Sequence, residues 1–274
     1  TEIPALWNVS PYLTRWMLWK RFHDGLDVSS PADVRMDWGS RMEPLVVAEA
    51  GSHLKMEVYP NREYARRGLF GCTRDATVIC PDRGPGAMET KCVFDYRQWM
   101  TDWHGGEQPP RHYELQLQQQ MYVGDGEKPF TWGVLPAWVC GEMVYFERQP
   151  MPDLWEAMES EAAKFFDSIR AHEEPDPFGK AIELPYLTSL PLRMGEIELS
   201  DDALVEAATQ LAEARASAKE SKALEDEAKV KLLAAMGIHE RMKLPGGIYV
   251  TASVSEVGEY KVKAQTRTTL KVRM

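Results

Sequence analysis

The sequence has few cysteines and no long apolar run, and both absences argue against whole classes of protein. Its four cysteines show no C-x-x-C spacing, which disfavours a zinc site or an iron–sulfur cluster and favours buried thiols. The six histidines form no H-x-x-x-H pattern. No stretch approaches the roughly 18 apolar residues of a membrane-spanning helix, and no signal peptide opens the chain. We therefore expect a cytoplasmic protein with no membrane partner.

Composition and charge are those of an ordinary globular protein. The 274 residues are 44% hydrophobic and 27% charged, which predicts one large domain, alone or with an appendage. The net charge of −10 disfavours a nucleic-acid partner, but residues 1–100 carry 13 Lys and Arg against 13 Asp and Glu. Two interpretations of the basic side chains there stay open, a local track for phosphates or a solvated surface. They are Arg15, Lys20, Arg21, Arg62, Arg66, Arg67 and Arg74.

Apolar periodicity and turn residues predict a core of mixed helices and strands over residues 1–172. The helix expected from Ser40 has this residue as its N-cap and Glu43 in its first turn, where the helix dipole favours a carboxylate. The helix at 112–121 is crowded with glutamines, which we expect to form a polar face. The expected elements are two helices within residues 1–25 separated by a break at 10–12, the helix from Ser40, a strand at 54–59, helices at 94–103 and 112–121, strands at 130–140 and 143–148, and a helix at 153–172.

The C-terminal third predicts a linker, a long helix and a small β element. Residues 173–199 are rich in proline and break the helical pattern as a linker does. Residues 200–274 are expected to form a helical arm over 201–236, capped by Ser200, followed by short strands within 243–254 and at 268–272. An a/d-type seam with a polar break fits an arm for self-association or for holding DNA, or a helix packed on its own domain. The seam residues are Leu204, Ala207, Leu211, Ala214, Ala218, Ala228, Leu232 and Ala235.

A hairpin with converging charged side chains is expected around residues 81–86, which are typical turn residues. Residues 78–80 suit a buried strand before this turn. Because side chains alternate along a strand, Glu89 and Lys91 share one face after it. The turn places Asp75 opposite Lys91, so two carboxylates and one ammonium come together. Such a cluster is unfavourable to bury without a purpose.

Two carboxylates on neighbouring strands form the kind of site that Mg²⁺ prefers, and this ion keeps several waters that substrate phosphates can replace. A neighbouring lysine can then hold or deprotonate the attacking water, whose pKa the ion lowers. The alternative is a solvated ion pair worth under about 1 kcal/mol. The hairpin taken alone favours the ion pair.

Four motifs, each weak alone, occur in an order that resembles a known family. They are Ser-Pro-Tyr followed by Leu-Trp-Lys within residues 10–20, Trp-Gly-x-x-x-Glu at 38–43, Asp…Glu-x-Lys-Cys at 75–92, and Tyr-x-x-Gln-x-Gln-x-x-Met at 113–121. Together they resemble the YqaJ-like viral recombinases, relatives of lambda exonuclease within the PD-(D/E)XK nuclease superfamily. The resemblance covers residues 1–172. It implies an α/β, restriction-endonuclease-like core with a central mixed sheet flanked by helices, followed by the helical arm and small β element.

The resemblance also implies roles for single residues. Asp75 and Glu89 match the central metal ligands, and Thr90 lends its backbone carbonyl. Glu43 matches a helix carboxylate near the metals, while Asp82 is a weaker alternative to Asp75. The remaining matches are Lys91 for the motif lysine, Gln116 for the glutamine that orients the lysine or the water, Tyr113 for its packing neighbour, and Ser10, Thr1 and Arg15 for contacts to DNA phosphate.

The implied function is a Mg²⁺-dependent exonuclease, with Mn²⁺ able to substitute, that degrades double-stranded DNA ends in the 5′→3′ direction and makes single strands for phage-type recombination. A homo-oligomer, a single-strand annealing partner and a phage or prophage protein in a bacterial cytoplasm are expected with it. Two alternatives stay open. One is an endonuclease or a Cas4-like nuclease, disfavoured by the missing iron–sulfur cysteines. The other is a non-catalytic DNA-binding or scaffold protein with a vestigial centre, which the intact residue set disfavours.

Overall fold

The chain divides into two units, Thr1–Leu184 and Pro185–Met274, and each is described by itself. The computed structural model describes residues 2–26, 34–60, 63–139, 141–189, 202–236, 241–243 and 249–251. None of the helices in these ranges is long and apolar enough to cross a bilayer.

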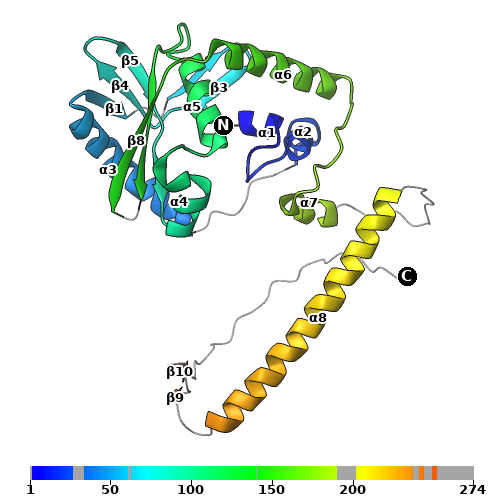
Figure 1. Cartoon of the computed structure of the whole chain (residues 1–274). Coiled ribbons are helices and arrows are strands. Elements are labelled where there is room, and N and C mark those ends of the chain that lie inside the picture. Colours follow the sequence, from blue (N-terminus) through cyan, green and yellow to red (C-terminus); the bar gives the residue numbers. More distant parts are fainter. Residues whose placement is uncertain are drawn as a thin grey trace. The chain divides into compact units, whose positions relative to one another are not determined.

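A six-stranded mixed sheet forms the centre of the first unit (Figure 1). Strands β1, β4 and β5 pair antiparallel, β5 and β6 run parallel to β7, and β8 pairs antiparallel with β7. The predicted α/β core with a central mixed sheet is therefore confirmed. The strands are β1 (Glu57–Pro60), β4 (Ala76–Cys80), β5 (Gly84–Met88), β6 (Lys91–Val93), β7 (Gly133–Val139) and β8 (Glu142–Arg148).

Strands β5 and β6 are two halves of one interrupted strand. β5 ends opposite Val134 and β6 begins opposite Ala137, so both halves follow the same register on β7. Glu89 and Thr90 fill the interruption, where the Glu89 N–H still donates to the Val134 carbonyl at 3.1 Å. A break in a ladder re-aims the side chains beside it, and the acidic residues lie at this break.

Helices cover both faces of the sheet. Helix α3 (Val34–Leu54) packs on one face, where Val47 and Ala50 contact the inward side chains of β4, β5 and β7. Helices α4 (Tyr96–Asp102) and α5 (Arg111–Val123) supply the core of the other face. Along β5, Met88 belongs to the first cluster and Ala87 to the second, as the alternation of side chains requires.

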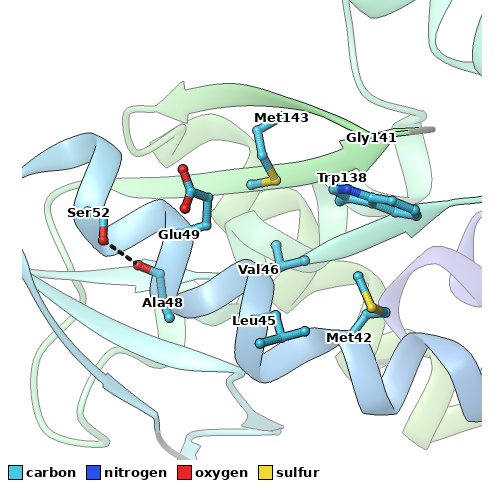
Figure 2. Close-up of a pocket in the computed structure, with 9 residues that line it drawn as sticks. All are labelled: Met42, Leu45, Val46, Ala48, Glu49, Ser52, Trp138, Gly141 and Met143. Carbon is cyan, nitrogen blue, oxygen red and sulfur yellow. Dashed lines mark hydrogen bonds between the residues drawn. The ribbon is translucent and has the colours of Figure 1, made fainter.

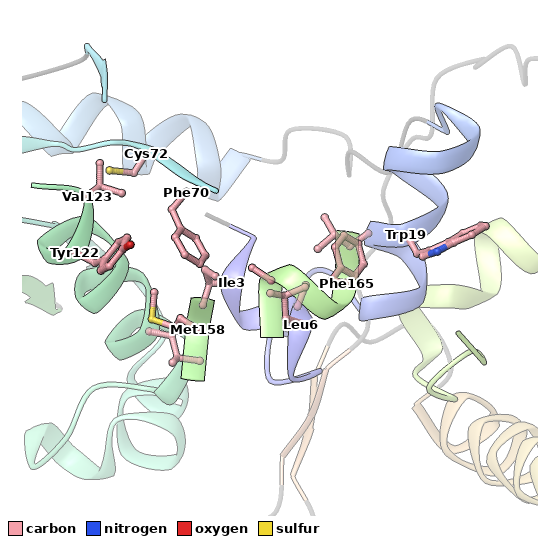
Figure 3. Close-up of a cluster of buried hydrophobic side chains, with 13 residues drawn as sticks. Ile3, Leu6, Trp19, Phe70, Cys72, Tyr122, Val123, Met158 and Phe165 are labelled. Carbon is pink, nitrogen blue, oxygen red and sulfur yellow. The ribbon is translucent and has the colours of Figure 1, made fainter. Parts of the chain in front are cut away.

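A third apolar cluster joins the N-terminal helices to α6 (Figure 3). Helices α1 (Ile3–Leu6), α2 (Arg15–Asp24) and α6 (Pro152–Arg170) meet there with α5 and the hairpin of β2 (Tyr64–Arg67) and β3 (Phe70–Thr73). The predicted helices within residues 1–25 and at 153–172 are thus confirmed. Thr14 caps α2 by accepting from the Met17 N–H at 3.3 Å.

Two local predictions are wrong. Helix α3 begins at Val34, so Ser40 is not its N-cap and Glu43 is not in its first turn. Pro44, a residue favoured near helix starts, lies inside this helix and made a start near Ser40 the expected one. The β2–β3 hairpin was not predicted, because its arginines and glycines lack the alternation of a half-buried strand.

The segment predicted as a linker contains the 3₁₀ turn η2 (Ala181–Glu183) and the short helix α7 (Leu184–Ser189). A further 3₁₀ turn, η1 (His104–Gly106), follows α4. In the second unit, helix α8 (Asp202–Met236) matches the predicted long helix. Strands β9 (Arg241–Lys243) and β10 (Tyr249–Thr251) pair antiparallel. Ser200 and the predicted strand at 268–272 lie outside the described residues.

Candidate active site

Glu89 is the most enclosed acidic side chain of the interruption, with 2% of its surface exposed. Its Oε1 accepts hydrogen bonds from Lys91 Nζ and Gln116 Nε2, and its Oε2 accepts one from Gln120 Nε2. Gln116 and Gln120 are one turn apart on α5 and therefore share a face. Three donors thus fix both oxygens of this carboxylate.

A close approach of α5 to the sheet makes these contacts possible. At Gly133, the first residue of β7, an added Cβ would lie 2.9 Å from Met121 Sδ and 3.0 Å from Leu117 Cδ1. Both partners are buried side chains of α5, so a larger residue would push the helix outward. Glycine at this position therefore helps bring Gln116 within reach of Glu89.

Asp75 precedes β4 and faces the interruption. Its Oδ2 accepts from the Thr90 N–H at 2.7 Å and from Thr90 Oγ1 at 2.8 Å. Burial first, and then the charge of Glu89, raise the pKa of Asp75 to about 6, against the opposing effects of Lys91 and the Thr90 hydrogen bonds. The register pairs Ala76 with Met88, so Asp75 meets Glu89 and Thr90, and the prediction that it lies opposite Lys91 is wrong. The turn is centred nearer to Cys80 than expected.

Lys91 is held between carboxylates and an aromatic ring. Burial alone would lower its pKa, but Glu89 and Asp75 outweigh burial and raise it. Its Nζ lies 4.7 Å from the centre of the Tyr113 ring, a favourable position for a cation. Burial first and then Tyr12 raise the pKa of Tyr113, so its hydroxyl stays protonated.

Glu43 is half-buried on α3, and its charge acts on Cys92, the neighbour of Lys91. Burial raises the pKa of Cys92, Glu43 and Asp75 add to this effect, and Lys91 opposes it. Among the described residues, no three His, Cys, Asp or Glu side chains come together as a metal site. Glu43 is therefore not placed beside Asp75 and Glu89 as a third ligand. Asp82 lies exposed in the hairpin turn.

The acidic pair nevertheless suits a hard divalent cation. Asp75 and Glu89 offer carboxylate oxygens, which Mg²⁺ prefers. Burial is the main cause of the raised pKa of Asp75, and repulsion from the Glu89 carboxylate adds to it. A bound divalent cation would relieve this repulsion, so the residues fit such an ion.

Two of the predicted phosphate contacts have partners within the fold. Ser10 is buried, and its Oγ accepts from the Tyr12 N–H at 3.1 Å. The Arg15 guanidinium pairs with Glu161 and donates to the Leu6 carbonyl at 3.1 Å. Thr1 lies outside the described residues.

Several of the other basic candidates have partners within the fold. Lys20 pairs with Glu174 and Arg21 with Glu2, both at 2.6 Å, while Arg74 is buried and donates to the Gly124 carbonyl. Arg66 and Arg67 donate to the carbonyls of Gly68 and Tyr122, and Arg62 lies outside the described residues. Both interpretations of these side chains therefore stay open.

The expected polar face of glutamines is wrong, because Gln118, Gln119 and Gln120 are buried. Gln118 Nε2 donates to the Gln149 carbonyl at 2.9 Å, and its Oε1 accepts from the Met151 N–H and from Trp155 Nε1. Gln120 was missed as a partner of Glu89. Its position four residues after Gln116 is the sequence signal that could have found it.

Two aromatic residues beside Lys91 were also missed. Tyr12 is 57% exposed, and its ring packs edge-on against His112 at 6.1 Å. The His112 ring in turn lies 4.0 Å from that of Tyr113. The loop before α2 therefore reaches the Lys91 side of the site.

A separate groove lies between α3 and the β7–β8 strands (Figure 2). Apolar side chains such as Leu45, Val46 and Met143 line it, together with Glu49. None of the predicted site residues is among its lining residues, so this groove and the acidic pair are different features of the surface.

Comparisons with known proteins agree with the fold. Residues 1–127 match the model of the YqaJ-like viral recombinase domain, the family that the motifs of the sequence resemble. The comparison with curated proteins gives no match. An alkaline exonuclease from Laribacter hongkongensis, LHK-Exo, is 17% identical, with a TM-score of 0.50 over 63% of this chain and 87% of that one. The structure of LHK-Exo in complex with dAMP is 16% identical, with a TM-score of 0.49 over the same shares of both chains. A phage-related exonuclease from Haemophilus somnus is 14% identical, with a TM-score of 0.46 over 57% of this chain and 80% of that one. At such identities the first likeness shows the fold, which is of the restriction-endonuclease-like type.

Proposed function

Because residues 1–127 form a YqaJ-like viral recombinase domain, we propose that the protein is a Mg²⁺-dependent exonuclease that hydrolyses phosphodiester bonds at the ends of double-stranded DNA. It degrades one strand in the 5′→3′ direction. The single-stranded product serves phage-type recombination in a bacterial cytoplasm, together with an annealing protein. The alkaline exonuclease fold of the solved relative is in keeping with this activity.

The observation that carries the proposal is the convergence of Asp75, Glu89 and Lys91 at the break between β5 and β6. Two carboxylates and an ammonium are gathered there from β4 and the interrupted strand. Gln116 and Gln120 hold Glu89 in a single orientation. The two amides also satisfy the lone pairs that Lys91 leaves free on this buried carboxylate.

Asp75, Glu89 and the Thr90 carbonyl would hold the metal, with Glu43 acting from α3. A bound divalent ion, or a pair of them, supplies positive charge that polarises the phosphate and activates water. Mn²⁺ substitutes for Mg²⁺ because it takes the same oxygen ligands.

The protein groups have distinct tasks in hydrolysis. Lys91 holds the attacking water by hydrogen bonds and offsets charge that develops on the phosphate. Tyr113 packs on the Lys91 ammonium and limits its orientations. The two amides on α5 keep Glu89 from turning toward Lys91 alone.

One experiment tests activity and polarity together. Linear duplexes labelled separately at the 5′ and 3′ ends are incubated with the protein and Mg²⁺, and a closed circular duplex is the control. Early release of the 5′ label with an intact circle is expected. Early release of the 3′ label would reverse the polarity, and cutting of the circle would favour the endonuclease. If the protein binds DNA but cleaves it with none of the divalent ions, the non-catalytic DNA-binding protein with a vestigial centre is favoured.

A further inference from the structure

Residues 174–183, here called the strap, fasten the end of the first unit to α2 and the loop before it. Glu174 accepts from Trp16 Nε1 at 2.8 Å and from Lys20 Nζ at 2.6 Å. Nine residues later, Glu183 accepts from the Thr14 hydroxyl at 2.6 Å. The strap is therefore anchored at both ends to the segment that reaches the Lys91 side of the site.

Glu183 also folds the strap itself. Only 1% of this residue is exposed, and its carboxylate accepts from the backbone N–H groups of Phe178, Gly179 and Lys180 at 3.0, 2.8 and 3.2 Å. Burial alone would raise the pKa of Glu183, but the Thr14 and backbone hydrogen bonds lower it. Gly179 adopts φ +84°, a conformation that favours glycine. The Lys180 side chain therefore extends from a turn whose backbone is fixed by hydrogen bonds.

The Lys180 ammonium is aimed at the loop before α2. Its Nζ donates to the Asn8 carbonyl at 2.6 Å and to the Ser10 carbonyl at 3.0 Å. An ammonium has three N–H donors, and within the described part of the chain the third has no partner. The side chain is only partly buried, so a DNA phosphate can approach this third donor.

Aromatic rings connect Lys180 to the catalytic lysine. The Ser10 loop carries Tyr12, whose ring meets His112, and His112 packs on Tyr113, which lies under Lys91. Burial first, then Lys91, and also Lys180, lower the pKa of His112 to about 4. The charges of both ammonium groups therefore act on the same imidazole.

We propose that Lys180 binds a backbone phosphate of the DNA strand held at Lys91, with the exposed rings of Phe178 and Tyr12 beside it for base stacking. Phe178 is 54% and Tyr12 57% exposed, and Lys180 Nζ lies 5.4 Å from the centre of the Phe178 ring. Exposed aromatic rings beside a cation are typical of single-strand binding surfaces. The proposal rests on the proposed function for its substrate. It makes the strap a wall of the DNA site in place of a plain linker.

The test measures DNA binding against salt concentration in a Glu89→Gln background with Ca²⁺, where cleavage does not interfere. Fluorescence anisotropy follows a labelled duplex with a 3′ overhang, with either a 5′-phosphate or a 5′-hydroxyl. The variants are Lys180→Met, Lys180→Arg and, as a matched control, Lys164→Met on α6, whose side chain is 67% exposed.

Lys180→Met is expected to weaken binding about tenfold near 0.1 M salt and to reduce the slope of log K against log salt by about 1, since one phosphate contact is lost. Lys180→Arg should keep both values, and Lys164→Met should change neither. Equal losses on both duplexes identify an internal phosphodiester, and a loss confined to the 5′-phosphorylated duplex identifies the terminal phosphate.

An unchanged salt slope in Lys180→Met overturns the proposal, whatever the thermal stability of this variant. A lysine that only holds the loop in place would change the affinity without changing the number of counterions released from DNA. A slope loss in Lys180→Arg equal to that in Lys180→Met overturns it too. Binding is read without turnover, so a wild-type protein that cleaves no DNA would refute the exonuclease function and leave this result standing.

Discussion

Helices α5 and α8 show how differently two helices of one chain are stabilised. α5 has 13 residues, and eight of them are buried, three glutamines included. α8 has 35 residues, and none whose exposure is described is buried. Its side chains are held by local ion pairs instead, such as Lys222 with Asp226 at 3.1 Å. Packing against the sheet, and not helix length, is what makes a helix part of the site.

The largest expected effect separates the site from α8. Lys91→Ala should reduce cleavage about 10²–10⁴-fold, because the group that holds the attacking water is lost, and Glu89→Ala should reduce it at least as much. Lys229→Ala on α8, whose lysine pairs with Glu225, should leave cleavage unchanged. Initial rates on a linear duplex measure this, with circular dichroism to check folding. A wild-type rate in Lys91→Ala would refute the assignment of the site.

The next largest effect compares a glutamine in each helix. Gln118→Ala leaves the Gln149 carbonyl, the Met151 N–H and Trp155 Nε1 without their partner. We expect a loss of about 3 kcal/mol in the free energy of unfolding, since this fully buried side chain loses three hydrogen bonds worth roughly 1 kcal/mol each. Gln210→Ala on α8, which removes an exposed contact to Glu206, should change it by less than about 0.5 kcal/mol. Urea unfolding measures the free energy of unfolding of both variants. Equal losses in Gln118→Ala and Gln210→Ala would contradict the comparison of the two helices.

Local patterns were sufficient for most elements near the site. The apolar run before the Pro- and Gly-rich turn predicted the β4–β5 hairpin, and periodicity predicted α5 and α6 closely. The motif order named Asp75, Glu89, Lys91 and Gln116 as site residues, and these side chains lie together in the structure, while their catalytic roles stay predictions. These are contacts within one hairpin and one adjacent helix.

Long-range polar partners were beyond the sequence patterns. Gln118 is satisfied by groups 31 to 37 residues away, and Thr14 and Glu183 are 169 residues apart. Propensity describes a residue and its neighbours, whereas burial of a polar group depends on a partner that only the tertiary fold supplies. The prolines of the strap predicted a linker because they describe only the local chain. The burial of Glu183 gave no local signal, since its partner Thr14 is distant in sequence.

A smaller effect concerns acid stability and Glu183. Because its folded pKa lies below its ordinary value of 4.5, the carboxylate stabilises the fold above about pH 4.5, and this contribution is lost as pH falls through the folded pKa. Glu183→Gln should therefore lower stability at neutral pH and flatten the decline below pH 4.5.

The matched substitution for that comparison is Glu225→Gln on α8. The pKa of Glu225 is also lowered, by Lys229 and Lys222, but these groups are fully exposed and screened by salt. Its effect should vanish at high ionic strength, while that of Glu183→Gln should persist. Chemical denaturation between pH 3 and 7 at two salt concentrations measures both. A steeper acid decline in Glu183→Gln than in the wild type would show that the buried carboxylate does not stabilise the fold.

The smallest effect on the chemistry is expected from removing α8. Its 35 residues span on the order of 50 Å at about 1.5 Å per residue, and it exposes Leu204, Val205, Leu224 and Val230 by 52 to 66%. Single exposed apolar side chains are ordinary on a protein surface, so the expectation that another chain covers α8 rests on its predicted a/d-type seam. We expect truncation after Leu184 to leave the initial cleavage rate unchanged, to reduce the mass in solution and to shorten the products of one binding event. Light scattering and a single-encounter degradation assay measure these changes. Unchanged mass and unchanged product lengths would remove α8 from the mechanism and leave it a helix that serves only its own unit.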